Sequence, residues 1–262
     1  MDNRILNILL ILFLLFNFLG CSKYKSEEES NTPSINQSLL TVDSTNENII
    51  DKLEQFYFKN RKNKQVQKED KQKEEEEKKE SDDKKEKLKE QMDREEWKGL
   101  TNKVEQLFKN WNRYESERSL PETQVKSIEK KMNQLTAEIE EEEMLSALFK
   151  ANQLNLDLAI LYRRYYNKEL RAVIKEMRAY MRSIVYWSKE EENNRFQGTK
   201  NLEKLEQGVN KMKNLVVKKE DKQLVKELEN YIQDLNEVIE EQNNSVLEIK
   251  GNLVLNKLSQ LK

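Results

Sequence analysis

The stretch 97-WKGLTNKVEQLFKNWNRY-114 sets the fold class of this chain. Its apolar residues recur at intervals of three and four, which is the spacing of one face of an amphipathic α-helix. The stretch 125-VKSIEKKMNQLTAEI-139 repeats this spacing, and Pro121 lies between the two. We therefore predict two helices that are joined by a turn at 119–122.

The same periodicity continues towards the C-terminus. Three further apolar stripes follow, at 152–188, 202–216 and 224–258. No segment alternates as a β-strand would. We predict an all-α fold, an antiparallel bundle of four to five helices over residues 94–262. A long intermolecular coiled coil is the alternative, because the spacing is also heptad-like. The interruptions at 119–122, 190–199 and 217–221 favour the bundle.

Two polar regions precede this predicted bundle. Residues 61–93 are almost entirely Lys, Glu, Asp and Gln, and they cannot bury a core. Opposite charges three and four residues apart support a solvated helix, and a disordered polyampholyte is the alternative. We predict a charged spacer here, helical or disordered. Residues 21–60 are predicted to be the lipidated N-terminus and tether. Within them, residues 22–45 are rich in Ser, Thr and Asn and are predicted to be disordered, and 48–60 form a short amphipathic patch.

The N-terminus carries an export signal. Arg4 is followed by an apolar run from Ile5 to Leu19, which is shorter than the roughly 20 residues of a membrane-spanning helix. The sequence 18-FLGC-21 resembles a bacterial lipobox, which implies removal of the signal peptide 1–20 and acylation of Cys21. The alternative is an uncleaved anchor with an incidental cysteine. Both interpretations attach the protein to a membrane.

Several kinds of chemistry lack the residues that they need. The chain has no histidine, and Cys21 is its only cysteine. Imidazole bases, His ligands and Cys–His nucleophiles are therefore excluded. The few glycines are too scattered for a phosphate-binding loop. We expect no enzymatic activity, no cofactor and no metal site, and the net charge of −2 predicts no affinity for nucleic acid.

Basic residues concentrate between residues 163 and 182. On one continuous helix with 100° per residue, the cations at 168, 171, 175, 178 and 182 lie within about 40° of Arg164, opposite the apolar face. We predict an exposed basic face that binds an acidic ligand, with Tyr165 as an anchor. The alternatives are an ordinary charged surface or pairing with a neighbouring helix through 138-EIEEEE-143. The candidate ligand-binding residues are Arg164, Tyr165, Lys168, Arg171, Lys175, Arg178 and Arg182.

The order of lipobox, polar tether, Glu/Lys-rich spacer and helical domain opening with 93-DREEWKGLTNKVEQL-107 resembles the plasmid-encoded surface lipoproteins of Borrelia spirochaetes. The OspE/F-related and Elp lipoproteins are the nearest in architecture, followed by the helical fibronectin-binding and complement-inhibiting lipoproteins. The resemblance implies a palmitate-type lipid anchor, display on the outer membrane surface, and virulence through binding of host complement or matrix proteins. It supplies no binding residue for this chain.

A second function stays open at this point. A structural lipoprotein of the periplasm or cell coat, self-associating through its helical seams into a homo-oligomer, would need no host ligand. Protease treatment of intact cells separates these two expectations.

Overall fold

The computed structural model describes residues 37–70, 79–165, 169–189, 195–241 and 243–261. Within these ranges it contains eight helices and no strand, so the predicted all-α class is confirmed. The helices are α2 (Gln37–Asp70), α3 (Lys79–Glu117), α4 (Glu122–Glu140), α5 (Met144–Tyr162), α6 (Glu169–Trp187), α7 (Arg195–Leu215), α8 (Lys219–Glu240) and α9 (Asn244–Gln260).

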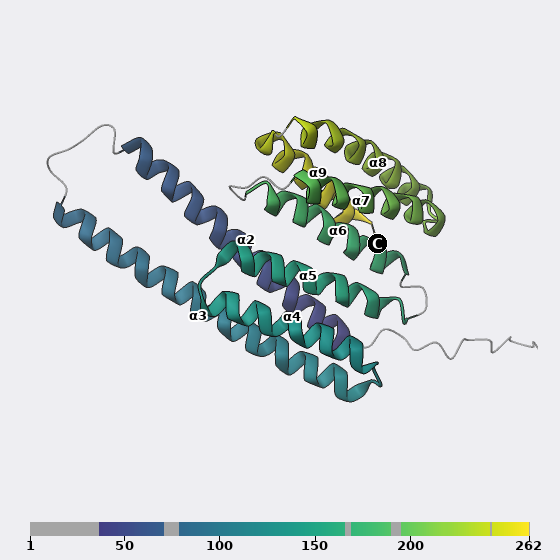
Figure 1. Ribbon diagram of the computed structural model, residues 1–262, viewed down its shortest axis with the longest axis horizontal. Helices are drawn as coiled ribbons and strands as arrows, with labels where there is room; N and C mark the ends of the chain where they lie inside the picture. Colours follow the sequence, from purple (N-terminus) through teal and green to yellow (C-terminus); the bar gives the residue numbers. More distant parts are fainter. Residues whose placement is uncertain (1–36, 71–78, 166–168, 190–194, 242, 262) are drawn as a thin grey trace, which may run out of the picture. The chain divides into compact units, whose positions relative to one another are not determined.

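The helices form two four-helix bundles that follow one another along the chain (Figure 1). In the first bundle α2 packs on α3, α3 on α4 and α4 on α5, and α5 returns to α2. The second bundle repeats this circuit with α6, α7, α8 and α9, and α9 returns to α6. Contact between α5 and α6 joins the two bundles. The sequence predicted a single bundle of four to five helices.

The larger number of helices has two causes: α2 precedes the predicted bundle, and the apolar runs 152–188 and 224–258 are each interrupted. The first run is divided between α5 and α6, and the second between α8 and α9. At the second break the Asn243 side chain accepts a hydrogen bond of 3.2 Å from the backbone N–H of Val246 and so caps α9. Neither break contains glycine or proline, the usual sequence signals of a helix end.

The turns at the two ends of α4 differ in kind. The helix begins directly after Pro121, which confirms the predicted turn. At its other end the backbone N–H of Glu143 donates to Glu138 O at 2.9 Å, and that of Glu142 donates to Ile139 O at 3.2 Å. Glu142 has a φ of 59°, the left-handed conformation that usually holds glycine at this position.

Helix α2 is part of the core of the first bundle. The prediction of a disordered tether over 22–45 is wrong for residues 37–45, and the folded domain includes α2 rather than beginning at 94. The apolar stripe was missed because Asp43 and Asn46 occupy buried positions within it and so interrupt the apolar periodicity. The buried apolar residues of α2 are Leu39, Val42, Ile49, Ile50, Leu53 and Phe56.

The charged segment 61–93 includes the C-terminal part of α2 and the N-terminal part of α3. Its described parts are helical, because α2 continues to Asp70 and α3 begins at Lys79. The helical form of the predicted spacer is therefore confirmed for these parts. Since α2 and α3 both belong to the first bundle, the segment is an insertion within a helical hairpin and does not connect the N-terminus to the folded domain.

Helix α6 makes close contacts on both sides within the second bundle. A Cβ atom on Gly208 of α7 would lie 2.5 Å from the Met177 Cγ and Sδ atoms of α6. A Cβ atom on Gly251 of α9 would lie 2.6 Å from Val185 Cγ2 and 3.0 Å from Met181 Cε. Only glycine allows the neighbouring helices to approach α6 this closely.

The predicted signal peptide and Cys21 lie outside the described residues. Of the helices described from residue 37 onwards, none combines the length and the apolar character that a membrane crossing requires.

Candidate functional site

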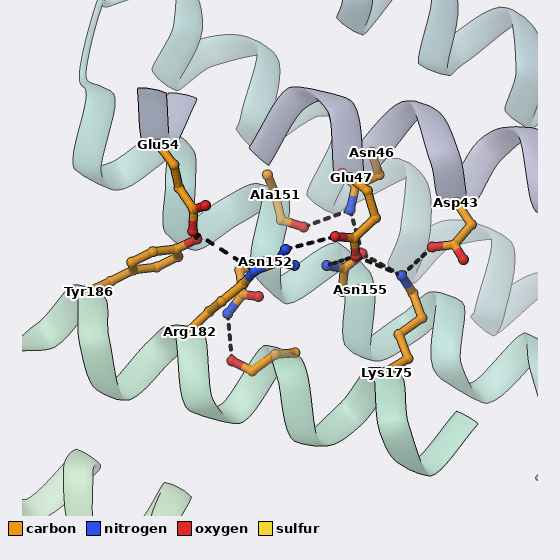
Figure 2. Close-up of polar contacts among 11 residues, drawn as sticks. Asp43, Asn46, Glu47, Glu54, Ala151, Asn152, Asn155, Lys175, Arg182 and Tyr186 are labelled. Atoms are coloured by element: carbon orange, nitrogen blue, oxygen red, sulfur yellow. Dashed lines mark hydrogen bonds and ion pairs between the residues drawn. The ribbon is translucent and has the colours of Figure 1, made fainter. Parts of the chain in front are cut away.

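A polar cluster joins the two bundles where α2 and α5 of the first face α6 of the second (Figure 2). Helix α2 supplies Asp43, Asn46, Glu47 and Glu54, which fall within an arc of about 100° around the helix axis. Helix α6 supplies Lys175, Arg182 and Tyr186, spaced by seven and four. Each helix thus turns a polar face to the other bundle and an apolar face into its own.

Glu47 lies at the centre of this cluster. Its Oε2 atom is 2.8 Å from Arg182 Nη2, and its Oε1 atom is 3.2 Å from Lys175 Nζ. Oε1 also accepts a hydrogen bond of 2.9 Å from Asn155 Nδ2. Burial alone would raise the pKa of the Glu47 carboxyl, but the positive charges of Lys175 and Arg182 hold this pKa well below its ordinary value. Glu47 is therefore a fixed negative charge.

Lys175 is held by acceptors from two helices. Its ammonium group donates to Asp43 Oδ1 on α2 and, at 2.8 Å, to Asn155 Oδ1 on α5. The second oxygen of Asp43 accepts a hydrogen bond of 2.6 Å from the Tyr162 hydroxyl. Burial and the charge of Asp43 raise the pKa of Tyr162 far above its ordinary value, so this hydroxyl stays a donor.

Side-chain amides connect α5 to the helices on either side. Asn46 Nδ2 on α2 donates to Ala151 O at 2.9 Å and to Asn155 Oδ1 at 2.7 Å. Asn152 Nδ2 donates to Ala179 O of α6 at 2.7 Å. Because these asparagines are almost fully buried, a shift in the register of any of the three helices would leave polar atoms unpaired.

Arg182 is buried at the far end of the cluster. Its Nε atom lies 3.9 Å from Glu54 Oε1, which accepts a hydrogen bond of 2.7 Å from the Tyr186 hydroxyl. Burial would lower the pKa of Arg182, but Glu47 raises it above the ordinary value. Both partners of the Glu47–Arg182 pair therefore keep their charges at any pH near neutrality, which suits a structural joint rather than proton transfer.

A pocket of about 520 Å³ opens beside this cluster. Helix α2 contributes Asp43 and Glu47, and both carboxylates are already bound to Lys175. Helix α6 contributes two further cations, Arg171 and Arg178, and no ion pair within 4.0 Å joins either of them to a carboxylate among the described residues. The remaining lining residues are Leu170, Ile174 and Lys175 from α6 and Leu258, Ser259 and Leu261 from the C-terminal end of the chain.

The two arginines differ in their surroundings. Arg171 is exposed, and its guanidinium carbon lies 5.0 Å from the centre of the Tyr162 ring. Arg178 is partly buried, and its Nε atom is buried without a hydrogen-bond partner among the described residues. Both side chains thus retain donors for an anionic group.

The predicted basic face is not one surface. Because α5 ends at Tyr162 and α6 begins at Glu169, Arg164 and Tyr165 do not belong to the helix that carries the other cations. Lys168 lies outside the described residues. Arg164 is exposed, as predicted, whereas Tyr165 is buried, with its hydroxyl 3.0 Å from that of Tyr114.

The predicted exposure is wrong for two of the cations on α6. The side chains of Lys175 and Arg182 are 8% and 5% exposed, because α2 covers this face. The alternative of pairing with a neighbouring helix is correct for them, but the partners are Asp43 and Glu47 rather than 138-EIEEEE-143. Sequence reasoning missed these carboxylates. The sequence feature that could have revealed them was the spacing of polar and apolar residues along 39–56, which is that of an amphipathic helix.

Comparison with known proteins does not supply a relative. No protein-family model matches the sequence, and neither the curated proteins nor the solved structures include a match.

Proposed function

We propose that this protein is a lipid-anchored, non-enzymatic binding protein of a bacterial outer surface, which recognises an acidic region of a host protein such as a complement or matrix component. One observation carries the proposal. Arg171 and Arg178 border the pocket without a carboxylate partner among the described residues, whereas the neighbouring cations Lys175 and Arg182 are matched. Unmatched arginines beside a pocket favour an external anionic partner.

The sequence supports the cellular setting of this proposal. The lipobox-like residues around Cys21 and the resemblance to spirochaete surface lipoproteins favour anchoring to the outer membrane and display on the cell surface. The absence of histidine and of any cysteine other than Cys21 favours recognition over catalysis.

A pull-down from serum and matrix proteins tests the binding. The bait is the chain from residue 22, which keeps every described residue and omits the expected lipid. We expect capture that weakens steeply as salt increases and that falls at least tenfold in the double variant Arg171→Glu/Arg178→Glu. The matched control is Arg113→Glu/Lys126→Glu, which makes the same change of charge at exposed positions of the first bundle. Undiminished capture by a folded Arg171/Arg178 variant would discard this site.

Two measurements on cells test the setting. Mass spectrometry of the mature N-terminus is expected to find an acylated Cys21. Protease added to intact cells is expected to remove the folded domain. Protection from protease would favour the periplasmic structural alternative, and sedimentation would then show whether the chain self-associates.

A further inference from the structure

We infer that the pocket between α2, α6 and α9 binds a single carboxylate that is carried on an apolar stem. This inference rests on the proposed function and deepens it by naming the chemical group that the site accepts. A fatty acid and the C-terminal apolar residue of a partner protein both carry this group, and the experiment below distinguishes the two.

The charges of the pocket favour an anion over a cation. Asp43 uses its two oxygens for Lys175 and the Tyr162 hydroxyl. Glu47 uses its oxygens for Lys175, Asn155 and Arg182. These two carboxylates are therefore neutralised from within the protein, and the pocket keeps an excess of positive charge from its arginines.

The positions of the arginines suit one small anionic group. Arg171 and Arg178 are two helical turns apart, about 10.5 Å along the axis of α6, and their long side chains reach the space between them. The Arg171 guanidinium carbon lies over the Tyr162 ring, and no N–H group of this side chain is hydrogen bonded to a described residue, so its donors are available to a ligand. The Nε atom of Arg178 is buried without a hydrogen-bond partner among the described residues, so no described acceptor holds this guanidinium at that atom.

The rest of the lining suits an apolar stem. Ile174 lies between the two arginines on the same face of α6, and Leu170 lies beside it. Leu258 and Leu261 line the pocket from the C-terminal end of the chain. The volume of about 520 Å³ falls within the range of about 300–1,000 Å³ that is typical of small-ligand sites. A compact inorganic anion would leave this apolar wall uncovered.

Calorimetric titration of the chain from residue 22 tests the inference with two matched pairs of probes. Octanoate is compared with octanol, and N-acetyl-leucyl-leucine with its C-terminal amide. We expect at least one carboxylate to bind with a 1:1 stoichiometry and at least tenfold more tightly than its neutral counterpart. Preference for octanoate would identify a lipid source, and preference for the dipeptide would identify a protein C-terminus.

Two variants assign the binding to this pocket. Arg171→Gln/Arg178→Gln is expected to weaken carboxylate binding at least tenfold. Ser259→Trp is expected to block the pocket. Because Ser259 is exposed, this substitution removes no buried contact. It therefore keeps the test decisive if the arginine variant does not fold. Arg113→Gln serves as the control. Failure of both carboxylates to bind, equal binding of the neutral probes, or full binding by a folded pocket variant would overturn the inference.

The result of the carboxylate titration can be separated from the result of the host-protein pull-down. If host protein capture depends on the arginines but neither carboxylate binds, the inference fails and the proposed function stands. If a carboxylate binds at the pocket but no host protein is captured, the ligand class stands and the host partner is wrong.

Discussion

The Oε2 atom of Glu47 lies 2.8 Å from Nη2 of Arg182, and this ion pair crosses from the first helical bundle to the second. The Arg182 side chain is 5% exposed and that of Glu47 is 23% exposed, so the pair is largely removed from water. A buried pair of this kind adds little net stability, but the loss of one partner is costly because it leaves the other charge buried and unmatched.

Glu47→Gln is therefore expected to destabilise the fold by about 3–5 kcal/mol. The substitution keeps the size of the side chain but leaves Lys175 with one carboxylate and Arg182 without its nearest one. Urea unfolding measures the free energy. Asp51→Asn is the control, because Asp51 is an exposed acidic residue of the same helix and its loss is expected to change stability by no more than about 0.5 kcal/mol. Equal effects of the two substitutions would contradict the central role of Glu47.

Acid is expected to destabilise the protein through the same carboxylate. The pKa of Glu47 is lower in the folded state than its ordinary value of 4.5, so the unfolded chain binds more protons in acid. The stability that comes from this difference is fully present above pH 4.5 and is lost progressively as the pH falls below it. Urea unfolding at pH 7, 5, 4 and 3 measures the loss. The loss should be smaller in Glu47→Gln, and identical pH profiles would contradict this assignment.

Gly251→Ala is expected to destabilise the second bundle by about 1–3 kcal/mol. The added Cβ would lie 2.6 Å from Cγ2 of Val185, a β-branched side chain that cannot rotate away freely. Gly99→Ala provides the comparison. Its Cβ would meet only the flexible end of Lys52 at 3.3 Å, so the higher helix propensity of alanine should stabilise α3 by up to about 1 kcal/mol. Thermal unfolding is expected to shift in opposite directions for the two variants, and shifts in the same direction would contradict the close packing at Gly251.

Glu142→Gly is expected to stabilise the fold by about 0.5–1 kcal/mol. Glu142 has a φ of 59°, which is strained for a residue with a Cβ atom, and glycine removes this strain at the end of α4. Glu141→Gly is the control, because its φ of −82° is ordinary and glycine there adds only flexibility. The melting temperature should rise in the first variant and fall in the second. A fall in both would argue against the left-handed turn.

A fragment of residues 94–262 is not expected to fold cooperatively. It lacks α2, whose apolar residues complete the first bundle and whose carboxylates neutralise Lys175 and Arg182. The fragment 22–262 keeps both contributions and is expected to unfold in one transition, seen by circular dichroism. A cooperative transition of the shorter fragment at the same temperature would show that α2 is dispensable.

The sequence predicted helices well where apolar spacing alone determines them. The stripes at 97–114 and 125–139 and the turn at Pro121 all appear in the structure. Only a short amphipathic patch at 48–60 was predicted within α2, because Asp43 and Asn46 occupy buried positions that the periodicity of a core helix assigns to apolar residues. The partners that make these polar residues acceptable in the core, Lys175 and Asn155, are more than a hundred residues away, so no local pattern indicates them.

Local sequence patterns also predicted the candidate site only in part. The concentration of cations on one face of 169–187 was visible in the sequence, and Arg171, Lys175 and Arg178 do line one pocket. The prediction placed all of these cations on one continuous helix, whereas α5 ends at Tyr162 and α6 begins at Glu169. Whether a charged face meets solvent or another helix depends on which helices come together, and this is decided by the whole fold.

The inclusion of α2 in the first bundle fixes how far the domain can move from its proposed anchor. Between Cys21 and Gln37 there are only the residues 22–36, whose contour length is at most about 55 Å. Lengthening the charged insertion between α2 and α3 would therefore leave the reach of the protein unchanged, whereas each residue added to 22–36 would extend it. The largest separation between the proposed lipid anchor and the folded domain is thus set by the number of residues in 22–36 and not by the charged insertion.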